Sequence, residues 1–390
     1  MHGARLFGLV YPTADHELEQ LVHDVYERYL FGNALNPLRF PELARLEQEV
    51  VQMMGSLMHL EVGGPFSGRG GGAMTSGGTE SILMSMKVNR ERARLRGIER
   101  PQIIAPRTAH PAYAKAAHYF DMELVSVPVT SEWRADVDAI AAAITPSTGV
   151  LIASAFTYPH GILDPVAEIA GLAAQHGIGC HVDACIGGMS LPFWERLGEP
   201  IDPWDFRVEG VTEISADIHK YGFIPKGASV VLHRDPDWFG HQVFTYDDWP
   251  SGLYASSGVA GAKPAAPIAT AWAALRSLGV EGYVELHGKV REASRALQAA
   301  INEIDGIEVV GQPVGPVLAF TTSDPSTHDI SAIGDVMDDK GWFVNRNTEP
   351  ESLHVMLSPA HAELMPRFVE DLRDAVASHG ARRGVEVRYA

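Results

Sequence analysis

The sequence predicts an α/β protein whose large domain holds a mostly parallel, mixed sheet, with a smaller α+β domain after it. Two patterns indicate this fold class. Short apolar runs alternate with helical segments over residues 70–233, as in a sheet covered by helices on both faces. Beyond residue 272 one long helix is followed by short strands and further helices, which is typical of a compact α+β unit. We therefore expect three parts: an N-terminal helical segment (1–60), a large domain (61–280) and a small C-terminal domain (281–390).

The elements follow in order from the apolar patterns. Two amphipathic helices are expected at 16–30 and 43–60, the first ending before Asn36-Pro37, because proline disfavours helical geometry in the residue before it. The large domain is expected to contain helices at 79–96 and 166–176 and strands at 102–105, 124–128, 149–156, 178–183, 211–216 and 228–233. The small domain is expected to contain helices at 272–297, 330–340 and 366–378 and strands at 307–310, 317–321, 342–344 and 354–357.

The composition excludes several classes of protein. The 390 residues carry a formal net charge of -18, which repels nucleic acid and anionic membranes, so neither is an expected partner. No apolar run approaches the roughly 20 residues that a membrane span needs, and the first residues do not resemble a secretory signal. Cys180 and Cys185 are too few for a disulfide framework and match no common zinc spacing. We expect a cytoplasmic protein with two free thiols and no metal site.

Four groups of residues carry chemistry, and the first is the segment TSGGTES around Gly78 and Thr79. Two glycines let the backbone approach a ligand closely, and a helix begins directly after them. The N-terminus of a helix offers unpaired N–H groups and a positive dipole end, so this segment could bind a phosphate. Taken alone, the pattern also fits a plain glycine turn with a capping residue.

Asp183 ends an apolar strand of the large domain, and His110 follows another. Ligands of open α/β sheets bind at the carboxyl ends of the strands. An acid in this apolar setting requires a cationic partner, and a protonated pyridine nitrogen is one such partner. A flat histidine ring at a strand end could stack on a planar cofactor. The alternatives are a buried acid paired with an arginine or histidine, and an ordinary loop histidine.

Lys220, in the segment SADIHKYG, follows another apolar strand by a few residues. A lysine becomes nucleophilic when its amine is removed from water or lies near other cations. His219 could supply positive character or bind a phosphate. A single lysine in a loop is otherwise a solvated surface charge.

The four groups occur in one direction along one α/β domain, and together they fit one cofactor. Pyridoxal phosphate has a phosphate, a ring face, a ring nitrogen and an aldehyde, and each group of residues would meet one of these. The sequence therefore predicts a pyridoxal-phosphate enzyme in which Lys220 holds the cofactor as a Schiff base.

Several longer motifs resemble the sphingosine-1-phosphate lyase family: TSGGTESILMSMK, HVDACIGG, HKYGFIPKG and GWFVNRNTEPESLHVML. The resemblance extends from the segment GLVY, at residues 8–11, to the region of His354. That family has fold type I, the aspartate-aminotransferase-like fold of pyridoxal-phosphate enzymes, and is close to the group II decarboxylases. The HKYG and GGTES motifs separate this branch well from ordinary aminotransferases and less well from the decarboxylases.

The resemblance implies a role for each matching residue. Lys220 would hold the cofactor, Gly78, Thr79 and His219 would bind its phosphate, His110 would stack on its ring, and Asp183 would pair with the pyridine nitrogen. Tyr11, Tyr158 and Lys226 would face the substrate and take part in catalysis, with Asn36 and Arg39 in the substrate site. The family is a homodimer with shared active sites. The segment YASSGVAGAKP, 254–264, would reach across, with Gly261 near the partner's cofactor phosphate.

Three positions depart from the family pattern. Arg39 stands, in a shorter loop, where the family has a histidine associated with the substrate phosphate. Ala262 and Lys263 stand where the family usually has serine and arginine. Arg39 could bind an oxyanion in a bidentate manner or select a different anion. These departures concern the substrate and leave the expected cofactor site unchanged.

We expect a carbon–carbon lyase that cleaves a phosphorylated sphingoid base, or a similar 2-amino-3-hydroxy substrate, in a retro-aldol sense. The products would be an aldehyde and phosphoethanolamine. The substrate is thus a small-molecule amine or amino acid, including a lipid phosphate. An amino-acid decarboxylase is the alternative enzyme, because it uses the same cofactor chemistry on a different bond. A non-catalytic protein that kept the fold is a third reading, which the presence of Lys220, Asp183 and His110 opposes.

Overall fold

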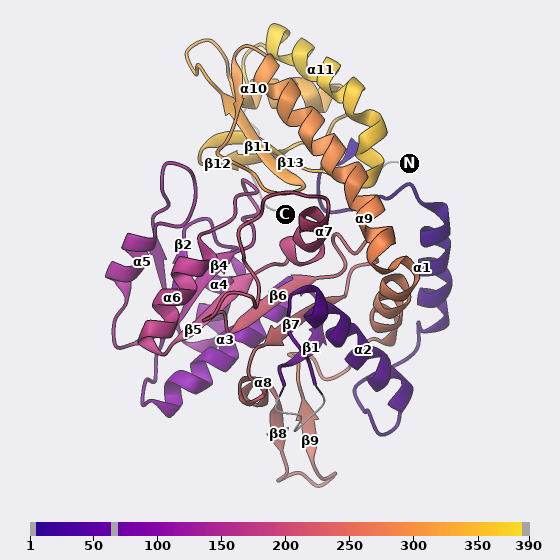
Figure 1. Cartoon of the computed structure of the whole chain (residues 1–390), viewed down its shortest axis with the longest axis vertical. Coiled ribbons are helices and arrows are strands. Elements are labelled where there is room, and N and C mark those ends of the chain that lie inside the picture. The colour runs from indigo at the N-terminus through magenta and orange to yellow at the C-terminus, as the bar shows by residue number, and fades with distance from the viewer. Residues whose placement is uncertain (1–4, 64–68, 384–390) are drawn as a thin grey trace.

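The computed structural model describes residues 5–63 and 69–383. A seven-stranded sheet forms the centre of the large domain (Figure 1). Its order is β1 (Gly71–Thr75), β7 (Ser229–His233), β6 (Glu213–Asp217), β5 (Gly179–Asp183), β4 (Thr148–Ser154), β2 (Gln102–Pro106) and β3 (Glu123–Val127). Strand β7 runs antiparallel to both of its neighbours, and the other pairs are parallel. The prediction of a mostly parallel, mixed sheet is therefore confirmed.

Both faces of this sheet are covered, because neighbouring residues of each strand point to opposite faces. Ile103 belongs to one apolar cluster, with side chains of α3 and α4, whereas Ile104 belongs to a second and larger cluster that includes α6 and α9. The helices of the large domain are α3 (Gly78–Leu95), α4 (Ala112–Phe120), α5 (Val137–Ala143), α6 (Val166–His176), α7 (Leu191–Arg196) and α8 (Pro236–Gln242), with a 3-10 turn at Gly187–Met189.

A long helix, α9 (Ala265–Glu303), connects the large domain to the small one (Figure 1). Its backbone leaves helical geometry at Gly279, which has φ of 56°, a value that glycine adopts readily. The predicted boundary at 280/281 falls next to this break. Helices α1 (His16–Arg28) and α2 (Pro41–Leu57) pack against α9.

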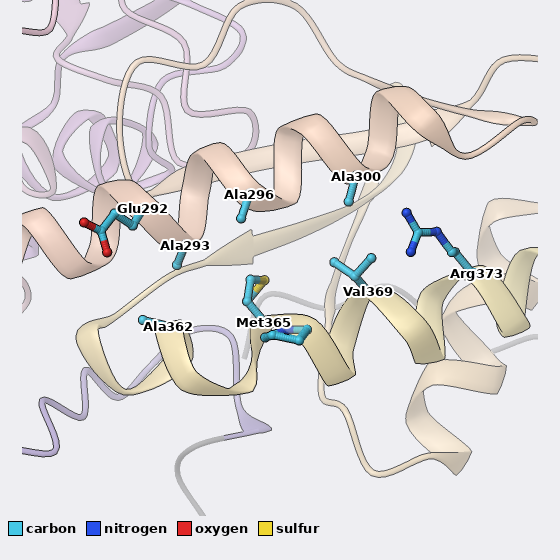
Figure 2. A pocket seen from close by; sticks show the side chains of 9 residues that line it. Glu292, Ala293, Ala296, Ala300, Ala362, Met365, Val369 and Arg373 are labelled. Atoms are coloured by element: carbon cyan, nitrogen blue, oxygen red, sulfur yellow. The ribbon is translucent and has the colours of Figure 1, made fainter.

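The small domain has a four-stranded antiparallel sheet in the order β10 (Ile307–Val309), β11 (Val317–Thr322), β13 (Glu351–Met356) and β12 (Asn345–Thr348). Helices α10 (Ile330–Asp339) and α11 (Met365–Ser378) and a 3-10 helix, η3 (Pro359–Leu364), accompany it. Between α9 and α11 lies an open groove of about 430 Å³, which Ala293, Ala296 and Val369 line with their short side chains (Figure 2). The groove shares no residue with the site described below.

Several elements differ from the sequence predictions. The strand expected at 342–344 is wrong: Trp342 is fully buried against Phe7 and Phe368, and regular pairing begins only at Asn345. Strand β1 was not predicted, because glycine is uncommon in strands. It also missed α4, α5, α7, α8 and the hairpin of β8 (Phe244–Tyr246) and β9 (Tyr254–Ser256). Over the described ranges, every helix is too short or too polar to cross a bilayer.

Candidate active site

The carboxyl ends of neighbouring strands bring the predicted residues to one edge of the large sheet. Asp183 is the last residue of β5, Lys220 follows β6 by three residues, and His110 follows β2 by four. Strands β5 and β6 pair directly, with Asp183 opposite Ser215. This edge is where open α/β sheets bind their ligands.

Lys220 forms an ion pair that the sequence analysis did not predict. Its Nζ lies 3.0 Å from Oδ2 of Asp217, and the two side chains are 21% and 2% exposed. Burial acts to lower the pKa of Lys220, but the Asp217 carboxylate, together with Tyr11 and Cys185, outweighs it and holds that pKa well above its usual range. Burial likewise acts to raise the pKa of Asp217, yet Lys220 and His219 bring it below the usual value. The acid three residues before Lys220 was the sequence signal that could have revealed this pair.

The first turn of α3 fits tightly against the same ion pair. A Cβ atom at Gly78 would lie 2.6 Å from Sγ of Cys185 and 2.9 Å from both carboxylate oxygens of Asp217. No side chain can occupy this position without a shift of its neighbours. Gly78 and Thr79 therefore present backbone N–H groups at the start of an 18-residue helix, beside Lys220. Such a helix start could bind a phosphate.

Asp183 and His110 occupy fixed positions near Lys220. Oδ1 of Asp183 accepts a hydrogen bond from the backbone N–H of Cys185 (3.0 Å), which orients the carboxylate. Nδ1 of His110 accepts one from the N–H of Ala112 (3.1 Å), at the start of α4. Burial lowers the pKa of His110, while Asp183 raises it and Lys220 lowers it further. The imidazole is therefore close enough to both Asp183 and Lys220 for their charges to act on it.

Lys226, Tyr11 and His219 form the next part of the site. Nζ of Lys226 donates to the carbonyl oxygen of His219 (3.2 Å) and lies 4.4 Å from the centroid of the Tyr11 ring. Although Lys226 reaches the surface of the single chain, partial removal from water lowers its pKa to about 8, and the charge of Lys220 contributes. His219 is buried, and its Nδ1 accepts from the N–H of Ala228 (3.2 Å). An amine with such a pKa can exchange protons near neutral pH.

Tyr158 enters the site from the loop after β4. It is close enough to Tyr221 to raise the pKa of that buried phenol, after burial itself and Tyr11. The Tyr11 ring packs edge-on against Tyr221, with 5.0 Å between centroids. Tyr221, which the sequence analysis did not select, donates from its hydroxyl to the carbonyl of Leu357 (2.9 Å) in the small domain.

Asn36, Arg39 and Gly261 lie elsewhere on the chain, in two segments that we call the outer loops (residues 30–40 and 254–264). Asn36 and Arg39 are exposed. The outer loops contact each other: the N–H of Ala34 donates to the carbonyl of Lys263 (2.8 Å). Lys263 forms an ion pair with Glu47 of its own chain. Among the described residues, no hydrogen bond or ion pair joins the side chain of Asn36 or Arg39 to Lys220 or Lys226.

Comparison with known proteins gives one consistent result. Residues 11–323 match the model of the pyridoxal-dependent decarboxylase conserved domain. Sphingosine-1-phosphate lyase of Oryza sativa is 41% identical over 93% of this chain and 67% of its own length, and sphingosine-1-phosphate lyase 1 of Rattus norvegicus is 41% identical over 95% and 64%. The solved Burkholderia pseudomallei sphingosine-1-phosphate lyase has a TM-score of 0.91 at 38% identity, covering 96% of this chain and 86% of that one.

This chain belongs to the sphingosine-1-phosphate lyase family. It is a pyridoxal-phosphate-dependent lyase with fold type I. The chain spans about two thirds of the length of its rice and rat relatives. Glutamate decarboxylase of Lactobacillus brevis, with a TM-score of 0.83 at 21% identity, shares the fold.

The residues present fit the cofactor of this family. Gly78 leaves room that a side chain would fill, next to a helix N-terminus. Asp183, His110 and Lys220 lie at one edge of the sheet. They supply an acid, a flat ring and a nucleophilic amine, which are groups that this cofactor needs. Lys220 could hold the aldehyde carbon, Asp183 the ring nitrogen, and the start of α3 with His219 the phosphate.

Proposed function

We propose that this lyase cleaves the bond between Cα and Cβ of a phosphorylated sphingoid base, or a similar 2-amino-3-hydroxy substrate. An aldehyde and phosphoethanolamine would leave. The observation that carries this proposal is Lys226, whose amine lies against Tyr11 and has a pKa of about 8. Retro-aldol cleavage needs a base for the β-hydroxyl proton, and a base with a pKa near the working pH is the most effective. Decarboxylation of an amino acid needs no such base for bond cleavage.

When bound, pyridoxal phosphate supplies an electron-withdrawing ring that takes up the electron pair of the broken bond. Asp183 would keep a proton on the ring nitrogen, and His110 would hold the ring plane. Lys226 would accept the β-hydroxyl proton at its neutral Nζ, and the Tyr11 ring would hold that amine in place. Tyr158 would orient the substrate from the loop after β4.

We further propose a homodimer in which the outer loops complete the partner's site. Phe31 and Leu38 are 98% and 91% exposed, and two large apolar side chains at that exposure on one loop are typical of a protein interface. Arg39 and Asn36 lie in the same loop and would reach the substrate phosphate of the partner. Gly261 would approach its cofactor phosphate. A cytoplasmic location fits the two free, buried cysteines, Cys180 and Cys185.

The proposal is tested by supplying the cofactor-loaded protein with three substrates: a phosphorylated sphingoid base, an aromatic amino acid and an acidic amino acid. We expect aldehyde and phosphoethanolamine in equal amounts from the first and no CO2 from the others. Release of CO2 without aldehyde from any substrate would contradict the proposal and support the decarboxylase alternative.

A further inference from the structure

Three consecutive residues of the large domain, Tyr158, Pro159 and His160, each contact the same hairpin of the small domain. The Tyr158 ring packs edge-on against His354 of β13, at 4.8 Å between centroids and 86° between planes. The carbonyl of Pro159 accepts a hydrogen bond from Nδ2 of Asn347 in β12 (2.8 Å). Nε2 of His160 lies 3.1 Å from the carbonyl oxygen of Glu349. The hairpin thus holds both the ring and the backbone of this segment.

Asn347 connects these contacts through its amide. Its Nδ2 donates to the Pro159 carbonyl and also lies 3.1 Å from Oγ of Ser352. Since a proline carbonyl can only accept, the orientation of the amide is determined, and Oδ1 of Asn347 faces Nδ1 of His354 at 2.9 Å. An amide oxygen is an acceptor, so Nδ1 of His354 must carry the proton. One amide therefore determines the tautomer of His354 and the position of the Tyr158 backbone.

His354 stays neutral in this position. It is 2% exposed, and burial, assisted by the charge of His160, lowers its pKa to about 3. Its Nε2 is therefore a bare acceptor, and it has no hydrogen-bond partner within the described part of the chain. A neutral ring with one fixed N–H keeps a single orientation against Tyr158.

We propose that Asn347 and His354 are positioning residues, which hold Tyr158 at the angle that it needs toward the substrate. The inference rests on the proposed function, in which Tyr158 faces the substrate. The hairpin also reaches the segment that carries His110, because Glu349 pairs with Arg107. Tyr158 is thus part of the large domain by sequence but takes its orientation from the small domain.

A double-mutant cycle of His354→Gln and Tyr158→Phe tests the proposal. His354→Gln removes the imidazole ring and its Nδ1–H. Tyr158→Phe removes the hydroxyl whose position the His354 ring is proposed to hold. Alone, His354→Gln should lower kcat about tenfold with KM nearly unchanged, since it affects an oriented group more than substrate affinity. In the Tyr158→Phe background the same change should lower kcat less than about twofold, because residues that act through one group are not additive.

His233→Gln is the matched control, because His233 is also a fully buried strand histidine, in β7, and bonds to Gln242. It should leave kcat within about twofold of the parent in both backgrounds. Equal losses from His354→Gln with and without the Tyr158 hydroxyl would overturn the proposal. The visible absorbance band of the bound cofactor should be the same in all variants, because none of these residues is proposed to contact it.

Asn347→Asp is a second variant in case His354→Gln fails to fold. Asn347 is half-buried, and an aspartate keeps the acceptor for His354 while losing the donor to Pro159. It should lower kcat by a similar factor, again only when the Tyr158 hydroxyl is present. The cycle is measured on aldehyde release, or on CO2 release if the parent protein decarboxylates. Failure of the lyase proposal and failure of the positioning proposal therefore give different results.

Discussion

Two lysines of the site, Lys220 and Lys226, have the same side chain and opposite electrostatic surroundings. Asp217 lies 3.0 Å from the amine of Lys220 and keeps its pKa high. The amine of Lys226 has an aromatic ring and a backbone carbonyl as neighbours, and its pKa falls to about 8. Lys220 is suited to stay paired with Asp217 until the cofactor binds. Lys226 is suited to exchange protons. The two roles follow from the neighbours, not from the residue type.

The proposed role of Lys226 as a base predicts how the reaction depends on pH. Only its neutral amine can accept a proton, so kcat should rise with pH through about 8 and then level off. Lys226→Arg should lower kcat by about 100-fold and abolish this rise, because a guanidinium stays protonated. The measurement is a pH–rate profile from pH 6 to 10, with the exposed Lys289→Arg as the control. A profile that is flat in the parent protein would show that Lys226 is not the base.

At the scale of single elements, the start of α3 depends on one glycine. Gly78→Ala places a methyl group 2.6 Å from Cys185 Sγ, so it should lower the free energy of unfolding by about 1–3 kcal/mol and weaken cofactor binding. Gly171→Ala is the matched control, because nothing lies within 4 Å of its added Cβ in α6. It should stabilise the protein by up to about 1 kcal/mol. Thermal unfolding and cofactor titration give both quantities, and equal behaviour of the two variants would contradict the steric explanation.

Strand β6 carries a buried acid that makes stability depend on pH. Glu213 is fully buried, and burial raises its pKa from 4.5 to about 7, against hydrogen bonds from Asn89 and Thr212. A raised pKa in the folded state means that this contribution to stability is complete below pH 4.5 and is lost as pH rises through about 7. Between pH 4.5 and about 7, the free energy of unfolding of the parent protein should fall by an amount on the order of 3 kcal/mol. Glu213→Gln, whose side chain is neutral at every pH, should not show this fall. Chemical denaturation at several pH values would show it; parallel curves for parent and variant would rule it out.

The sequence analysis predicted those elements that show a clear local pattern of apolar residues. Strands such as β4 and β5 are mostly apolar at their centres and buried throughout, and helix α6 was predicted with the bounds that it has. Lys220, Asp183 and His110 were recognisable because each ends or follows a strand of the large sheet. Asp217 was overlooked although it precedes Lys220 by only three residues. Asn347 and His354 could not be recognised, because their partners Pro159 and Tyr158 are distant in the sequence. The strand expected at 342–344 was wrong because Trp342 is apolar for packing against Phe7, a contact over 335 residues.

At the scale of the whole molecule, a single chain brings the proposed cofactor residues together with Lys226 and Tyr11, and leaves Asn36 and Arg39 outside. Lys220, Asp183 and the start of α3 meet at one sheet edge. Arg39 is exposed on an outer loop, and Lys263, at a family arginine position, pairs with Glu47 of its own chain. The proposed cofactor site can therefore form within one chain, whereas Asn36 and Arg39 are proposed to join a substrate site only in the dimer.

Shared sites make a complementation experiment possible. Chains with Lys220→Ala and chains with Gly261→Trp should each be inactive, but mixing and reassembling them in equal amounts should restore about a quarter of the parent activity. The reason is that half of the dimers are mixed, and each mixed dimer has one intact site. Parent chains mixed with Lys220→Ala chains give the reference for exchange. A mixture that stays inactive, although mass measurement shows mixed dimers, would contradict shared sites.

The most direct measurement compares the products of the cofactor-loaded parent protein and of Lys220→Ala on a phosphorylated sphingoid base. The parent protein should show a visible band from the cofactor bound to Lys220 and should release a long-chain aldehyde and phosphoethanolamine in equal amounts. Lys220→Ala should keep the fold by circular dichroism, lose the band and release neither product. Aldehyde release by Lys220→Ala at the parent rate, or CO2 in place of aldehyde from the parent, would contradict a carbon–carbon lyase built on Lys220.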